Sequence, residues 1–203
     1  MFHVKHEGPG LGSAGVELDR SQTERLEAFE RVLAARAVPL GLVAEADSGL
    51  LWERHVLDCL RAAAEVGTRD RDACDLGSGA GLPGIVMAIA CSWMSVTLVE
   101  ARQISGGFLE LVVDTLKLGN ARVVVGRAEE LADRFDVCFA RAFGDARASW
   151  AAAGPLLRPG GRLIYFAGEG FDPVPDSPSG VVTSLVAPPP IERMGPLAIM
   201  SRQ

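Results

Sequence analysis

Apolar positions near the start of the chain recur at the spacing of amphipathic helices. Ser21 and Glu24 have the spacing of a capping box, and apolar side chains follow them three and four residues apart. Pro39 would end this helix, and a second helix is expected over about 50–66. The first part of the chain is therefore predicted to be helical.

The spacing changes at Asp72, after which short apolar runs alternate with helix-length segments. This alternation is typical of β-α-β units and a parallel sheet. Arg158–Gly161 would end the last helix, and the proline-containing stretch 168–180 would be a loop. The predicted strands are Ala73–Leu76, Val96–Val99, Arg122–Val125, Val137–Ala140, Arg162–Phe166 and Val181–Val186. The predicted helices between them are Pro83–Cys91, Gly107–Leu118 and Ala146–Leu157.

The order of these elements predicts an α/β, Rossmann-like fold with a mostly parallel central sheet and helices on both faces. A chain of 203 residues is long enough to bury one such core. Residues 1–16 are rich in glycine and histidine and have no period, so we expect a flexible tail there. Residues 17–70 would form a helical extension packed on the main domain, and 71–203 would be the Rossmann-like domain with a shortened C-terminal part.

Composition and charge narrow the class of protein. Hydrophobic residues make up 48% and charged residues 23% of the chain, as in ordinary globular proteins. The chain has no apolar run of roughly 18 residues and no signal-peptide pattern, so we expect a cytoplasmic monomer without membrane contact. Four scattered cysteines and three histidines argue against a metal site and predict reduced, buried thiols. The net charge of −6 argues only weakly against a nucleic-acid partner, because a local basic patch matters more.

A glycine-rich loop, Asp75–Gly84, is expected between the first strand of the sheet and the helix that follows. Gly77, Gly79 and Gly81 allow left-handed backbone conformations and remove the Cβ atoms that would keep a ligand away. The pattern by itself fits both a dinucleotide and S-adenosylmethionine. Asp75 favours S-adenosylmethionine, because a carboxylate would repel a pyrophosphate but accept a hydrogen bond from an amino group.

Two further positions would complete a cofactor site. Glu100 is expected to end the second strand, where its carboxylate could accept hydrogen bonds from both ribose hydroxyls of either cofactor. Ala128 and Glu129 follow the third strand and could face an adenine ring. An alternative function, a NAD-dependent oxidoreductase, lacks its Tyr-x-x-x-Lys pair, because Tyr165 is the only tyrosine and Glu169 stands four residues later.

The chain resembles the RsmG (GidB) family of bacterial methyltransferases from about residue 20 to 167. Four segments in the same order carry the resemblance: Leu51–Asp58, Asp75–Ile85, Arg127–Glu130 and Arg141-Ala142. The resemblance implies a class I S-adenosylmethionine-dependent fold. It also implies methylation of N7 of guanine 527 in the 530 loop of 16S ribosomal RNA, presented as naked RNA or in the small ribosomal subunit.

The resemblance also implies roles for individual residues. S-adenosylmethionine would contact Gly77, Leu82, Ala128, Glu129 and Arg141, with Glu100 at the ribose. Arg141 is expected to reach the cofactor carboxylate or an RNA phosphate, because a cation beside a sulfonium is unfavourable. No catalytic residue is expected, because guanine N7 carries a lone pair and no proton. The candidates for RNA contact are Arg54, His55, Arg102 and Phe143.

The upstream segment carries a predicted ion pair. Arg54 and Asp58 lie four residues apart, so they are expected to pair on one face of an exposed helix, where His55 could join them. Phe143 could stack on a base or belong to the core.

Some positions depart from the family pattern. Gly106 and Gly107 would weaken the start of the helix after the second strand. Ala167-Gly168 lacks the lysine that usually follows the fifth strand, and the next helix is expected to be missing. These departures would reduce the RNA-binding surface, so the alternative is a catalytically weak relative that binds S-adenosylmethionine or RNA.

Overall fold

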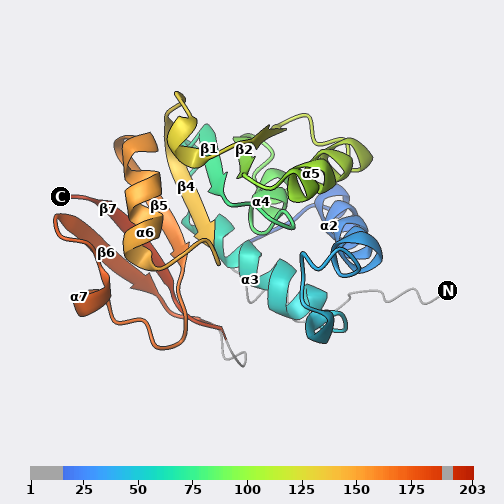
Figure 1. Cartoon of the computed structure of the whole chain (residues 1–203), viewed down its shortest axis with the longest axis horizontal. Coiled ribbons are helices and arrows are strands. Elements are labelled where there is room, and N and C mark those ends of the chain that lie inside the picture. Colours follow the sequence, from blue (N-terminus) through green and yellow to red (C-terminus); the bar gives the residue numbers. More distant parts are fainter. Residues whose placement is uncertain (1–15, 189–193) are drawn as a thin grey trace.

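The computed structural model describes residues 16–188 and 194–203, which form one layer of strands between helices (Figure 1). Seven strands make a single sheet in the order β3-β2-β1-β4-β5-β7-β6. The first five are mutually parallel, and β7 is antiparallel to both of its neighbours. The predicted α/β, Rossmann-like, mostly parallel sheet is confirmed. The strands are β1 (Asp72–Leu76), β2 (Ser95–Glu100), β3 (Ala121–Val125), β4 (Phe135–Arg141), β5 (Leu157–Phe166), β6 (Val181–Val186) and β7 (Leu197–Arg202).

Alternate side chains of the central strands enter two separate cores. Ala73 of β1 and Phe139 of β4 belong to the core shared with α4 (Gly84–Ala90) and α5 (Gln103–Thr115). Their neighbours Cys74 and Cys138 enter the core on the other face, beneath α6 (Ala146–Ala153). Strands buried on both faces explain why they read in the sequence as short continuous apolar runs. All four cysteines are buried and free, as predicted.

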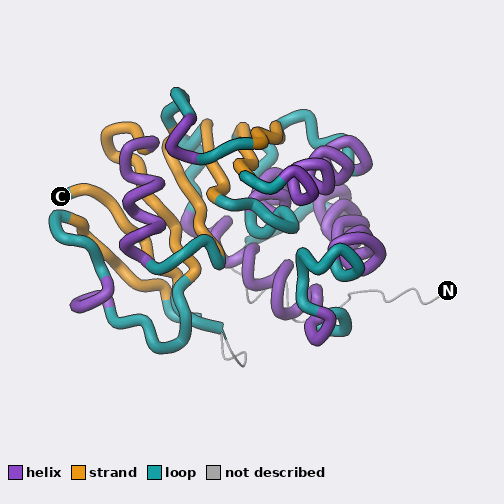
Figure 2. Tube along the Cα trace, viewed as in Figure 1, coloured by secondary structure: helices purple, strands orange, loops and turns teal. Residues whose placement is uncertain are grey.

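The N-terminal extension packs on the face that carries α4, with α2 at the end of the sheet away from β6 (Figure 1 and Figure 2). Its elements are α2 (Arg20–Val32), a π-helical turn (Leu33–Ala37), a second π-helical turn (Trp52–Val56), α3 (Leu57–Leu60) and a 3-10 turn (Arg61–Glu65). Phe29 and Leu60 are completely buried in the same apolar cluster as α4. Val16 also packs against this cluster, so the predicted tail does not extend to residue 16, and its residues 1–15 lie outside the described part.

The capping prediction for α2 is wrong by two residues. Asp19 is the N-cap, its carboxylate accepts the backbone N–H of Gln22, and the Gln22 side chain accepts the Asp19 N–H. The amide of Gln22 then donates to the carbonyls of Ile89 and Ala90 at the end of α4. Glu24 instead pairs with Arg20 on the exposed side. The cap therefore also anchors the extension, which local spacing alone could not indicate.

The C-terminal part differs most from prediction. β7 was not predicted, although it completes the sheet between β5 and β6. β5 begins at Leu157 rather than Arg162, with a register irregularity opposite Phe135, so Arg158–Gly161 bends a strand instead of following a helix. The expected loop 168–180 contains a one-turn helix, α7 (Pro173–Asp176). This one-turn helix stands where a helix was expected to be missing, and the sheet beyond it includes β6 and β7.

α5 forms in spite of its two glycines and starts four residues earlier than predicted. A Cβ atom on Gly106 would lie 2.5 Å from Val125 Cγ2, so the glycine allows the helix to pack closely on β3. Among the described residues no helix is long and apolar enough to cross a bilayer, and no group of three metal-ligating side chains occurs.

Candidate cofactor-binding site

The turn after β1 needs glycine for two different reasons. Gly77, Gly79 and Gly81 have φ angles of +64°, +53° and +83°, in the left-handed region that other residues rarely adopt. A Cβ atom on Gly77 would also lie 2.7 Å from Cδ2 of Phe143. On Gly81 it would lie 2.5 Å from Cγ1 of Ile85. The loop therefore follows a tight path that its sequence makes possible.

Glu100 holds this loop from the end of β2. One of its carboxylate oxygens accepts the backbone N–H of Gly79 at 2.9 Å, and the other accepts the backbone N–H of Arg102 at 2.8 Å. The side chain of Arg102 lies 3.5 Å away and is 67% exposed, whereas Glu100 is only 6% exposed. Charge-assisted bonds of this kind are stronger than neutral ones. The position of the Glu100 carboxylate in the site is therefore fixed by these two hydrogen bonds.

Two pockets meet above the loop. One, of about 380 Å³, opens toward the N-terminal extension, and the other, of about 310 Å³, opens toward the turn after β3. Gly77, Glu100, Arg102 and Ala142 line both pockets. The carboxylate of Glu100 therefore stands at the junction of a two-lobed cavity, at the carboxyl ends of the parallel strands, where open α/β sheets bind ligands.

The second lobe contains the predicted adenine wall. Ala128 and Glu129 line it, from a short 3-10 turn (Ala128–Glu130) after β3. Phe143 forms the opposite wall, and it is 36% exposed with its ring against Gly77. Phe143 is therefore not the core residue that the sequence left open. It closes the cavity at the end of β4.

Asp75, predicted to contact a cofactor amino group, is buried under the loop and is not among the residues that line the two lobes. Its Oδ2 accepts the backbone N–H of Gly84 at 2.9 Å, which ties β1 to the start of α4. Its Oδ1 is buried without a hydrogen-bond partner, and the residue is 1% exposed. Burial raises the pKa of Asp75 to about 6. Gly81 is also not among the residues that line the two lobes, and it belongs to the buried side of the loop.

Arg141 sits in the first lobe, and its charge is already paired. Its guanidinium bonds to Asp58 Oδ2 at 3.2 Å, to the carbonyl of Arg54 at 3.2 Å and to His55 Nδ1 at 2.9 Å. Asp58 also binds Arg61, so two arginines share one carboxylate, whose side chain is only 12% exposed. This network connects β4 to the N-terminal extension beside the pocket.

The predicted pair between Arg54 and Asp58 does not form. Arg54 binds Asp47, whereas Asp58 lies in α3 and is buried against Arg61 and Arg141. His55 lines the first lobe, with Nε2 3.3 Å from Asp47 Oδ2. Burial, and then the charge of Arg141, lowers the pKa of His55. Because a guanidinium can only donate, His55 Nδ1 accepts from Arg141.

The protein matches the family described as rRNA small subunit methyltransferase G over residues 22–171. The ribosomal RNA small subunit methyltransferase G of Thermobifida fusca is 41% identical over 143 residues, which cover 70% of this chain and 60% of that protein. The protein of the same name from Mycolicibacterium paratuberculosis is 38% identical over 193 residues, covering 83% and 76%. The chain belongs to the small subunit rRNA methyltransferase G family.

Solved structures at lower identity share the fold alone. Trm5b from Pyrococcus abyssi is 17% identical, with a TM-score of 0.53, over 71% of this chain and 47% of that one. A mutant of MtNAS is 18% identical, with a TM-score of 0.57, over 89% and 73%. The strand order, with one antiparallel strand inserted near the edge, is that of the class I methyltransferase fold.

Part of the site of this methyltransferase G family member was not predicted from the sequence. Leu42, Val43 and Ala44 line the first lobe from the connection between the two helical parts of the extension. Asp47 of the same connection fixes Arg54 and His55. The sequence of this connection has the pattern of a turn. Such a pattern does not indicate that its residues line a pocket.

The geometry at Gly77 predicts that a substitution there lowers both the free energy of unfolding and the affinity for the cofactor product. Gly77→Ala adds strain at positive φ, about 1–2 kcal/mol, and a clash with Phe143, about 1–3 kcal/mol. The matched control Gly180→Ala has φ of +75° and nothing within 4 Å of the new Cβ, so it adds only the strain. Chemical denaturation should show a larger loss of unfolding free energy for Gly77→Ala, and calorimetry should show weaker S-adenosylhomocysteine binding for it alone. Equal effects of the two variants would contradict the role of Phe143.

The buried Asp75 predicts an unusual dependence of stability on pH. Because its pKa is about 6 in the folded protein and about 3.9 in an unfolded chain, the folded state binds the proton more tightly. The free energy of unfolding should therefore fall between about pH 4 and pH 6, by ~2 kcal/mol from this group alone. Asp75→Asn removes the titration, so its stability relative to the native protein should rise over this range. Denaturation curves that differ by a constant amount at pH 4 and pH 7 would refute the assignment.

Proposed function

We propose that this protein transfers a methyl group from S-adenosylmethionine to N7 of a guanine in 16S ribosomal RNA, guanine 527 in the 530 loop. The observation that carries the proposal is the two-lobed cavity around Gly77 and Glu100, in a chain of the small subunit rRNA methyltransferase G family. The chain spans 60% of the Thermobifida protein and 76% of the Mycolicibacterium protein.

The two lobes fit the two halves of S-adenosylmethionine. The adenosine half would occupy the lobe of Ala128 and Glu129, with the ribose at Glu100, whose carboxylate faces both lobes. The methionine half would occupy the lobe of Leu82 and Arg141. The glycines at the junction leave room that a Cβ atom would fill. These residues fit the cofactor by shape and by hydrogen-bonding groups.

The electrostatics of the first lobe are compatible with a sulfonium. An isolated guanidinium would repel a positively charged sulfur, and Asp58, which binds both Arg141 and Arg61, offsets only part of this repulsion. Arg141 retains donors that can hold a carboxylate at the rim. Glu100 adds a fixed negative charge at the junction of the lobes.

Methylation at guanine N7 requires no proton transfer by the protein. When bound, S-adenosylmethionine supplies a methyl group that is open to attack by a lone pair. Because guanine N7 carries no proton, no residue of this chain would have to remove one. The chain must hold the two reactants in line and exclude water, which can account for much of the acceleration. Backbone turns and paired charges of this chain would do that positioning.

The RNA would approach over the exposed residues at the mouth of the cavity. Arg102, at the junction of the lobes, has an exposed side chain, and Phe143 is partly exposed at the second lobe. An unstacked base of single-stranded RNA can stack on such a ring. The side chain of Arg54 binds Asp47 and its carbonyl accepts from Arg141, while His55 contacts both Asp47 and Arg141. We assign them to the support of Arg141 rather than to the RNA.

Transfer of labelled methyl groups tests the proposal. Small ribosomal subunits and 16S RNA from a strain without its own enzyme should gain 7-methylguanosine. Arg102→Ala should raise the KM for RNA about tenfold and leave S-adenosylhomocysteine affinity nearly unchanged, because the backbone N–H that binds Glu100 remains. Arg25→Ala, an exposed arginine on α2, is the control and should change neither.

Three outcomes would contradict the proposal. Label on another base would refute the target. Binding of S-adenosylhomocysteine without any transfer would favour the catalytically weak relative. Protection by NAD and none by S-adenosylhomocysteine would favour the oxidoreductase.

A further inference from the structure

The guanidinium of Arg141 is held by three acceptors, and one of its nitrogens is left over. Nε donates to Asp58 Oδ2 at 3.2 Å. Nη2 donates to the carbonyl of Arg54 at 3.2 Å and to His55 Nδ1 at 2.9 Å. Within the described residues Nη1 makes no hydrogen bond, so both of its donors remain for a ligand. Arg141 lines the first lobe, where such a ligand would lie.

His55 is the acceptor among these three that a proton can remove near neutral pH. An imidazole nitrogen accepts a hydrogen bond only while it carries no proton. Nε2 of His55 is buried and lies 3.3 Å from Asp47 Oδ2, although the pair is not aligned as a hydrogen bond. A carboxylate in this place attracts the ring proton to Nε2 and leaves Nδ1 as the acceptor, which is the tautomer that Arg141 requires.

The surroundings of His55 oppose a second proton on its ring. Arg141 faces the ring from β4 and Arg54 from the same π-helical turn, whereas Asp47 faces it from the 3-10 turn Glu45–Asp47. Burial, and then the charge of Arg141, lowers the pKa of His55, and Asp47 acts in the opposite direction. A proton on Nδ1 would set an N–H donor against the N–H donors of Arg141 Nη2.

We propose that His55 is a positioning residue for the cofactor: as the neutral Nε2–H tautomer it turns Arg141 so that Nη1 meets the carboxylate of the methionine half. The inference rests on the proposed function, because it takes the first lobe as the site of that half. Protonation of His55 would break its bond to Arg141 and turn the guanidinium away from the carboxylate. Cofactor affinity should therefore be constant at alkaline pH and fall below about pH 6.5, the ordinary pKa of histidine.

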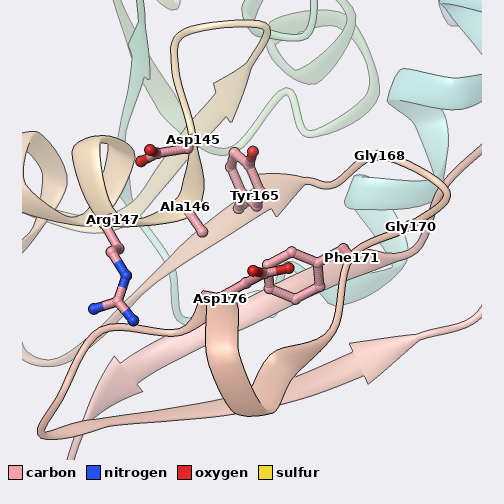
Figure 3. A pocket seen from close by; sticks show the side chains of 8 residues that line it. All are labelled: Asp145, Ala146, Arg147, Tyr165, Gly168, Gly170, Phe171 and Asp176. Carbon is pink, nitrogen blue, oxygen red and sulfur yellow. The ribbon is translucent and has the colours of Figure 1, made fainter.

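A separate pocket provides a comparison. It has a volume of about 310 Å³ and lies between the start of α6, the end of β5 and α7, with Arg147 among its lining residues (Figure 3). Arg147 is exposed and donates to the carbonyl of Pro175 at 2.7 Å. His55, the one histidine among the described residues, does not line this pocket. Arg147→Ala therefore removes a positive charge without touching the arrangement around Arg141, and it is the control.

The test measures S-adenosylhomocysteine binding by calorimetry at about pH 7.5 and about pH 5, on the native protein and on two variants of the same branched shape. His55→Asn offers an amide oxygen at the position of Nδ1 and does not titrate, whereas His55→Leu offers no acceptor there. Native affinity should fall at least about threefold at the lower pH, because fewer molecules have a neutral His55. Arg147→Ala should behave like the native protein.

The two variants should separate at the higher pH. His55→Asn should bind within about threefold of the native protein and show no fall at the lower pH, because its acceptor is permanent. His55→Leu should bind about tenfold more weakly at both values, because Nη2 of Arg141 loses a partner.

A smaller ligand distinguishes positioning from a general structural role. 5′-Methylthioadenosine has the adenosine half and no carboxylate, so it should bind equally to the native protein and to both His55 variants at each pH. Asp75 also titrates in this range, with a pKa of about 6, and it lies near Arg141 and Glu100. Asp75→Asn should therefore keep the pH dependence of S-adenosylhomocysteine binding if His55 is its source.

The outcomes separate this inference from the proposed function. Native affinity that does not change with pH, equal affinity of His55→Asn and His55→Leu, or weaker binding of 5′-methylthioadenosine by these variants would overturn the inference and leave the proposed function standing. Loss of the pH dependence in Asp75→Asn would overturn it as well, in favour of Asp75. If the native protein does not bind S-adenosylhomocysteine at either pH, the proposed function itself fails.

Discussion

The buried carboxylate of Glu100 is the interaction on which the rest of the site depends. By accepting the backbone N–H groups of Gly79 and Arg102, it fixes the glycine turn after β1 and the chain entering α5 at the same time. Burying a carboxylate costs free energy unless the group is hydrogen-bonded. Here each oxygen of Glu100 accepts one backbone N–H, from Gly79 and from Arg102. The same group faces both lobes of the cavity, so one residue shapes the loop and offers acceptors to a ligand.

The N-terminal extension is part of the site and not only a cover for the sheet. Asp58 holds Arg141, at the end of β4, and Arg61, which in turn donates to the carbonyl of Gly195 in the connection before β7. Three distant segments therefore meet at one buried carboxylate beside the first lobe. Breaking a buried ion pair leaves an uncompensated charge, which is costly. We therefore expect the extension and the end of β4 to keep the same relative position.

Sequence patterns could predict what is local or periodic. The five parallel strands are continuous apolar runs, and the glycine turn has a recognisable spacing, so both were found with Glu100 at the right strand end. The partners of Arg54 and Arg141 depend on segments brought together by folding; Arg141 and Asp58 are 83 positions apart. The sequence pattern does not predict β7, because residues 187–196 rather than a short hairpin turn separate it from its antiparallel neighbour β6, and its other partner is the distant β5. The hydrogen bond that Asp75 accepts from the backbone of Gly84 is likewise visible only in the folded loop.

Calorimetric titration with S-adenosylhomocysteine tests the central claim most directly, on the native protein and on Glu100→Gln. The native protein should bind one equivalent. The glutamine variant should bind at least tenfold more weakly, because an amide has only one oxygen for the N–H groups of Gly79 and Arg102 and loses an acceptor for the ribose. Absence of heat with the native protein, or equal affinity of the two proteins, would contradict the account of this cavity.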